Sequence, residues 1–195
     1  MHPPTTGMNG KIVKAVQRFF DVGQLPQRAD CIFVFAGRQE RKVHGLQLYK
    51  AGYASRIVFS VGRFEWRKFP ELGLENDGGL VDGVQETPPR KRHFFVDIEG
   101  NRATCSLIRK GMFGTMSEAA ALCRLAGKEN LRSLLIVSSS YHLRRCLECV
   151  EGFCSDAALK IIPVAAPPER PLPSQPDVGA LVGEGIKYLL YKLLV

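Results

Sequence analysis

Short runs of β-branched and aromatic residues recur along the chain, each bounded by polar residues or glycine. Runs of this kind are typical of strands that are buried on both faces of a sheet. The predicted strands are residues 31–36, 56–61, 94–98, 134–137 and 159–164. We therefore expect a central sheet of about five strands.

Segments with apolar residues at helical spacing lie between several of these runs. The predicted helices are residues 42–51, 117–125 and 143–150, with two more at 11–20 and 178–194 that would cover the sheet near the termini. Alternation of strands and helices favours right-handed crossovers and a parallel sheet. The predicted fold is α/β, a Rossmann-like three-layer αβα sandwich with a mainly parallel sheet.

A length of 195 residues fits one domain with a substantial core. Residues 166–176 form a proline-rich connection that is incompatible with a helix or a central strand. Residues 63–93 interrupt the alternation, and long irregular insertions in compact domains often serve as lids or binding loops. We expect a lid beside the second strand.

The chain carries a formal net charge of +8, which favours an anionic partner. Most of the charge is scattered, and the one compact cluster is Arg90, Lys91, Arg92 and His93. This cluster fits a solvated loop before a strand, or a nucleic-acid contact. The sequence lacks an RNA-binding, zinc-finger or convincing helix-turn-helix signature, which disfavours a nucleic-acid-binding module.

No apolar stretch approaches the ~18 residues of a membrane span, and we expect a cytoplasmic protein without a transmembrane segment. The terminal segment 187–195 suits an amphipathic helix docked on the core, and a peripheral membrane contact stays open.

The six cysteines are expected to be reduced thiols, because the chain does not have the small, cysteine-dense composition of a secreted disulfide scaffold. Cys146 and Cys149 form a C-x-x-C pair within a predicted helix. A zinc site would need two further ligands, and no second C-x-x-C supplies them. We therefore expect buried small side chains here, and no metal.

Ligands of doubly wound sheets bind at the carboxyl ends of the strands. Gly37, Arg38 and Arg41 follow the first predicted strand, where a glycine lets the backbone approach a ligand and arginines can clamp a phosphate or carboxylate. Ser60, Gly62 and Arg63 repeat this pattern after the second strand. No G-x-G-x-x-G or Walker motif is present.

Two helix starts carry further candidates. Thr115 and Glu118 have the T-x-x-E spacing of a capping box, which would explain both residues without a ligand. The segment 138–145 combines serines, including Ser139, with His142, Arg144 and Arg145. Because arginines oppose the positive pole of a helix N-terminus, two of them there suggest an anion between them. The serines could equally be ordinary N-caps.

In order and spacing, these motifs resemble the DUF218 family (YdcF/SanA/ElyC-like proteins). The matching residues are Asp30, Gly37, Arg41, Leu48-Tyr49-Lys50-Ala51-Gly52, Ser60-Val61-Gly62, Thr115-Met116-Ser117-Glu118-Ala119 and Ser139-Ser140-Tyr141-His142-Leu143-Arg144-Arg145-Cys146. The match spans roughly residues 29–165, so the whole chain, 1–195, is expected to be a single DUF218-like domain. The chain departs from the family where Val61-Gly62 replaces a glycine pair and where residues 109–110 are basic rather than acidic.

The resemblance implies that Arg41, Thr115, Glu118, His142 and Arg145 line a pocket, with Gly37 and Gly62 shaping its backbone. It implies a nucleotide-like or phosphorylated anionic ligand, a role in cell-envelope metabolism, and S-adenosylmethionine as a candidate cofactor.

Two functional hypotheses follow. In the first, the domain binds, and acts on, an anionic small molecule, with His142 as general acid or base and Glu118 as its acidic counterpart. In the second, it is a non-catalytic S-adenosylmethionine-binding or regulatory domain. The sequence does not decide whether the protein is an enzyme.

Overall fold

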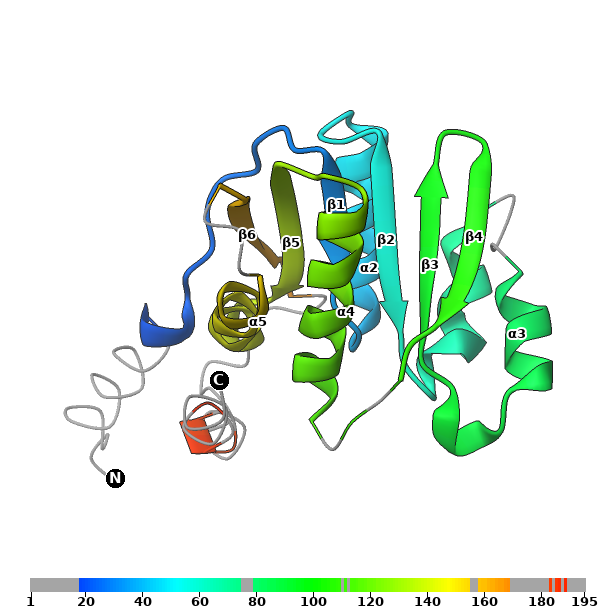
Figure 1. Cartoon of the computed structure of the whole chain (residues 1–195). Helices are drawn as coiled ribbons and strands as arrows, with labels where there is room; N and C mark the ends of the chain where they lie inside the picture. Colours follow the sequence, from blue (N-terminus) through cyan, green and yellow to red (C-terminus); the bar gives the residue numbers. More distant parts are fainter. Residues whose placement is uncertain are drawn as a thin grey trace, which may run out of the picture.

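The computed structural model describes residues 18–74, 79–109, 111, 113–154 and 158–168, together with 183, 185, 186 and 188. One six-stranded sheet runs through these residues in the order β4-β3-β2-β1-β5-β6 (Figure 1). The strands are β1 (Cys31–Val34), β2 (Arg56–Val61), β3 (Phe94–Glu99), β4 (Arg102–Leu107), β5 (Ser133–Ser139) and β6 (Lys160–Ala166).

The sheet is mixed. β1 pairs in parallel with β2 and β5, and β5 pairs in parallel with β6. β3 runs antiparallel to both β2 and β4. The sequence analysis placed all of these strands except β4, whose alternation of exposed and half-buried residues lacks the apolar run on which the prediction relied. Gly100, which has a positive φ of 56°, turns the chain between β3 and β4.

Two apolar clusters fill the two faces of the sheet. Side chains of successive strand residues point to opposite faces, so Ile32 and Val34 pack with Leu46 of α2 (Gln39–Lys50). On the other face, Phe33 packs with residues of α4 (Gly114–Lys128) and α5 (Ser140–Phe153). In Figure 1, α4 and α5 lie in front of the sheet and α2 lies behind it.

These helices confirm the predictions at 42–51, 117–125 and 143–150, and each is longer than its predicted range. The helix predicted at 11–20 is described only at its end, residues 18–20, which are helical. Of the helix predicted at 178–194, the four described residues are also helical. The proline-rich connection lies mostly outside the described residues, and its first residue, Ala166, belongs to β6.

The predicted irregular region 63–93 contains three short helices among its described residues. They are the 3-10 helix η1 (Glu65–Leu72), α3 (Leu80–Glu86) and the 3-10 helix η2 (Pro89–Lys91). Phe69, Leu72, Leu80 and Val84 anchor this region in the core. A lid role is a prediction that this packing leaves untested.

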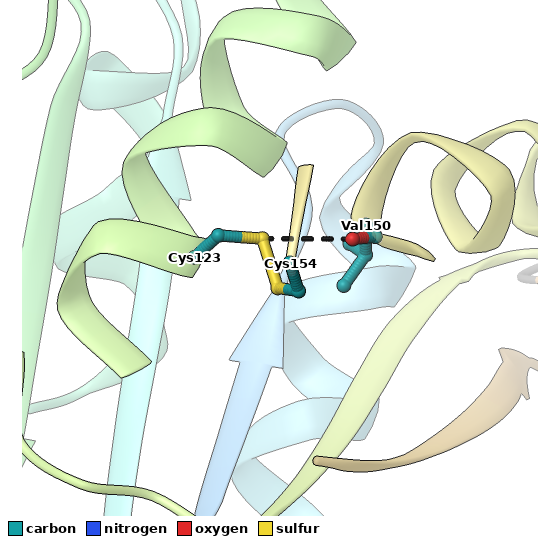
Figure 2. Close-up of a disulfide and its surroundings, with 3 residues drawn as sticks. All are labelled: Cys123, Val150 and Cys154. Atoms are coloured by element: carbon teal, nitrogen blue, oxygen red, sulfur yellow. Dashed lines mark hydrogen bonds between the residues drawn. A yellow bond between two sulfur atoms is a disulfide. The ribbon is translucent and has the colours of Figure 1, made fainter. Parts of the chain in front are cut away.

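The expectation of six reduced thiols is wrong for Cys123 and Cys154. These residues form a disulfide that joins α4 to the residue after α5 (Figure 2). The sulfur of Cys123 also lies 3.6 Å from the carbonyl oxygen of Val150. Composition could not reveal this pairing, because the two cysteines are 31 residues apart and only the packing of α4 against α5 brings them together. Cys31, Cys105, Cys146 and Cys149 form no disulfide within the described part of the chain.

None of the helices within the described part of the chain is long and apolar enough to span a membrane.

Candidate functional site

A cavity of about 770 Å³ opens at the edge of the sheet where β1 and β2 end. Its described lining residues are Ala36, Gly37, Arg38, Gly62, Arg63, Phe64, Glu65, Arg90, His93, Gly114, Thr115, Glu118 and His142. β1 lies between β2 and β5, with α2 and α4 packed on opposite faces. The cavity therefore occupies the position at which doubly wound sheets bind their ligands.

The lining is rich in positive charge. Arg38, Arg63 and Arg90 are exposed and reach the cavity from three different segments. The two carboxylates of the lining, Glu65 and Glu118, each already face a basic side chain. The arginines therefore dominate the field that an incoming ligand meets.

Glu118 is the most deeply buried acid of the site, with 4% of its surface exposed. Its Oε1 accepts a hydrogen bond from the backbone N–H of Ala36 at 2.9 Å and lies 3.6 Å from Nε2 of His93. Burial alone would raise the pKa of Glu118, but His93, Ser60 and the Ala36 N–H together outweigh it and lower the pKa. Glu118 is therefore a carboxylate at neutral pH.

Ser60, His93 and Glu118 do not form a nucleophilic triad. A triad uses both imidazole nitrogens, one toward the nucleophile and the other toward the acid. Here the Ser60 hydroxyl lies 2.8 Å from Nε2 of His93, the same nitrogen that faces Glu118. Ser60 is also fully buried. Glu118 and His93 instead line the cavity, and Ser60 supports His93 from behind.

The capping-box interpretation of Thr115 and Glu118 is wrong. The N-cap of α4 is Phe113, and no side chain makes a capping hydrogen bond there. Glu118 reaches across to the end of β1, and the Thr115 hydroxyl lies 3.4 Å from Nε2 of His142. Both side chains of the T-x-x-E motif are thus directed to the cavity wall rather than to their own helix.

His142 is buried at the start of α5 and is held from both sides of its ring. Its Nδ1 lies 2.7 Å from the Ser138 hydroxyl and 3.0 Å from the sulfur of Cys146, and its Nε2 faces Thr115. Burial raises the pKa of Cys146, so this neighbour remains a thiol. The imidazole of His142 thus borders the cavity, and its role as general acid or base stays a prediction.

Arg41 stands behind the cavity wall instead of lining it. Its Nε donates to the hydroxyl of Ser139 at 2.9 Å, and its Nη1 donates to the carbonyl oxygen of Ala36. A Cβ on Gly37, where φ is +135°, would lie 2.5 Å from Arg41 Nη1. The positive φ therefore favours glycine at this turn, and an added Cβ would also displace the Arg41 guanidinium.

Lys42 is a site residue that the sequence analysis missed. It is fully buried, and its ammonium donates to Glu65 and contacts the carbonyl oxygen of Gly37 at 3.4 Å. The Glu65 side chain is itself partly buried, and a Cβ on Gly62 would collide with it. This ion pair ties the turn after β2 to the turn after β1.

The two arginines of α5 do not converge on the cavity. Arg144 points away from the site, donating to the carbonyl oxygen of Phe19 and lying over the Phe19 ring at 4.2 Å. Arg145 is buried and is not among the residues that line the cavity. Ser139 is the N-cap of α5 but makes no capping bond there, so the ordinary-cap interpretation is also wrong for it.

The structure thus brings most of the predicted residues to one place. Those that line the cavity are Gly37, Arg38, Gly62, Arg63, Thr115, Glu118 and His142, whereas Arg41, Ser60 and Ser139 support its wall from behind. Asp30 lies at the opposite end of β1, where it accepts hydrogen bonds from the N–H groups of Arg132 and Ser133. Those backbone bonds, that of Arg132 foremost, lower the pKa of Asp30.

His93 was assigned to a solvated basic loop, and for this residue the assignment is wrong. It is only 4% exposed and sits directly before β3. Because β3 is antiparallel to β2, its first residue lies at the edge where β2 ends. The signal that would have placed it is the glycine turn at residue 100, between two runs that can pair as a hairpin.

No group of three or more potential metal ligands occurs within the described part of the chain. Comparisons of the chain with protein-family models, curated proteins and solved structures return no match. Functional inference therefore rests on the residues and their geometry.

Proposed function

We propose that the chain is a Rossmann-like, DUF218-like domain that binds an anionic phosphorylated or nucleotide-like small molecule in the cavity at the strand ends. The observation that carries this proposal is the charge of the lining. Three arginines meet there from separate segments, while Glu65 and Glu118 are already paired with Lys42 and His93. Such an excess of positive charge favours a phosphate or carboxylate group.

The backbone around the cavity supports the same ligand class. Gly114 and Thr115 begin α4, whose first N–H groups lack partners within the helix and whose dipole favours a negative charge. Gly37 and Gly62 keep the two strand ends free of side chains that would fill the space. A phosphate could thus meet both guanidinium and backbone donors.

Catalysis is the second part of the proposal. His142 would act as general acid or base, and the Glu118 carboxylate would accept hydrogen bonds from hydroxyl groups of the ligand, such as those of a ribose. Replacing His142 with alanine should leave ligand binding within about threefold and abolish any turnover. Binding by the unaltered protein without product from any phosphorylated substrate would instead favour a non-catalytic domain that binds S-adenosylmethionine or regulates a partner.

The resemblance also carries a proposed role in cell-envelope metabolism. A ligand screen of nucleotides, sugar phosphates and polyprenyl phosphates would test it.

Calorimetric titration with pyrophosphate, ADP and S-adenosylmethionine tests the binding proposal. Arg63→Ala and Arg90→Ala should each weaken binding of the phosphorylated ligands by roughly tenfold, the loss of a charge-assisted hydrogen bond worth about 1.5 kcal/mol. Arg102→Ala is the matched control. It removes the same charge, but Arg102 is exposed at the end of the β3–β4 hairpin that lies away from the cavity. Equal effects of all three substitutions, or no binding by the unaltered protein, would contradict the proposal.

A further inference from the structure

Phe64 is a large apolar side chain exposed on the wall of an otherwise polar cavity. Its surface is 66% exposed, although it directly borders the cavity after β2. Exposed aromatic residues are common on protein surfaces and need no function. This one differs because it shares a cavity with three arginines and the buried Glu118 carboxylate.

Phe64 lies in a turn that a backbone hydrogen bond closes. The N–H of Glu65 donates to the carbonyl oxygen of Gly62 at 3.0 Å, and the Glu65 carboxylate accepts from buried Lys42. The Arg63 guanidinium lies over the Phe64 ring at 4.2 Å from its centroid. These bonds fix the backbone after Phe64, and the exposure of its ring leaves surface for a second planar group.

The rest of the lining limits what that group can be. Among the described lining residues, Ala36 is the one other apolar side chain, and the remainder are glycine, threonine or ionisable residues. A prenyl or acyl chain needs an extended apolar channel, which this set of side chains does not provide. A single aromatic ring suits a flat ring, since base–aromatic stacking requires only one exposed face.

We infer that the cavity takes a nucleoside phosphate, with its base stacked on Phe64 and its phosphates among Arg38, Arg63 and Arg90. This inference rests on the proposed anion site and narrows its ligand from phosphorylated or nucleotide-like molecules to nucleoside phosphates. A cavity of about 770 Å³ is large enough for such a ligand.

The test compares AMP with ribose 5-phosphate, pyrophosphate and a short-chain prenyl phosphate by calorimetry, using the full chain. AMP and ribose 5-phosphate carry the same phosphate and differ by the base, so the unaltered protein should bind AMP about tenfold more tightly, the range expected for one stacked base. Phe64→Ala should remove that difference by weakening AMP alone, and Phe64→Trp should retain it. Phe153→Ala, an exposed phenylalanine that borders a separate cavity near the disulfide, is the control and should change neither affinity.

Each other outcome counts against the inference in a distinct way. Equal affinities for AMP and ribose 5-phosphate, or equal losses for both in Phe64→Ala, would overturn base stacking while leaving the anion site intact. Tighter binding of the prenyl phosphate would replace the nucleotide with a lipid phosphate. Absence of binding by every phosphorylated probe would overturn the anion site and this inference together.

Discussion

Oε1 of Glu118 lies 3.6 Å from Nε2 of His93, and both side chains are almost completely buried. This contact joins α4 to the first residue before β3, two segments that meet only because β3 runs antiparallel to β2. The same Glu118 oxygen accepts a hydrogen bond from the Ala36 N–H, which holds the carboxylate at the carboxyl end of β1. The pair is therefore both a structural tie and a wall of the site.

The first prediction concerns the coupling of this pair. His93→Gln should destabilise the fold by about 3 kcal/mol, because it leaves a buried carboxylate without its partner. Glu118→Gln removes the charge, so the double variant should be more stable than the sum of the single effects predicts. Denaturant unfolding of all four proteins measures the coupling energy. Additive effects would show that the two side chains do not interact.

The second prediction concerns acid stability. Since the pKa of Glu118 is lower in the folded chain than in the unfolded chain, the unfolded state binds more protons as the pH falls. The stabilisation is fully present above the unfolded pKa, about 4.3 for an ordinary Glu, and is lost as the pH falls through the folded value. Between pH 6 and 3, the free energy of unfolding should fall less steeply for Glu118→Gln than for the unaltered protein. The exposed Glu99→Gln control should decline like the unaltered protein.

The third prediction concerns Gly37. Alanine there would adopt an unfavourable φ of +135° and place its Cβ against Arg41, so Gly37→Ala should lower stability by roughly 2 to 3 kcal/mol. Gly127→Ala is the control, because its Cβ would meet nothing within 4 Å in a helix and should be neutral or slightly stabilising. Melting temperatures measure both effects. A Gly37→Ala protein as stable as the control would mean that this turn is not under steric constraint.

The sequence predicted the buried parallel strands and their helices well, because Cys31–Val34 and, within β5, Leu134–Val137 are continuous apolar runs of the kind found in strands buried on both faces. It failed at β4, an exposed strand without such a run, and therefore failed to predict the direction of β3. For the same reason the position of His93 was not predicted, since a residue before β3 would lie at the opposite edge of the sheet if β3 were parallel to β2.

At the site, Glu118 and His142 were placed correctly on the cavity wall, but the imidazole closest to Glu118 is that of His93. Local patterns such as T-x-x-E report which helix turn a residue occupies and not which strand end faces it. Lys42 was not predicted as a site residue for a similar reason. Its buried ammonium is paired with Glu65, which lies 23 residues further along the chain.

The fourth prediction concerns the disulfide. Closing a loop between residues 31 positions apart should stabilise the oxidised chain by about 3 to 4 kcal/mol. Reductant should therefore lower the melting temperature of the unaltered protein and leave that of a Cys123→Ser/Cys154→Ser variant unchanged. Alkylation of the denatured, unreduced protein should label Cys31, Cys105, Cys146 and Cys149. Labelling of all six cysteines would show that the disulfide does not form. A disulfide that does form would favour an oxidising compartment over the expected cytoplasm.

The central claim is that an anion binds where β1 and β2 end, and amide chemical shifts recorded during a titration with ADP test it most directly. The account predicts shifts at Ala36, Gly37, Gly62, Gly114 and Thr115, which border the cavity, with little change at Gly127, Asn130 and Leu131 around the separate cavity beside the disulfide. Shifts confined to the second group, or no shifts at millimolar ADP and pyrophosphate, would contradict it.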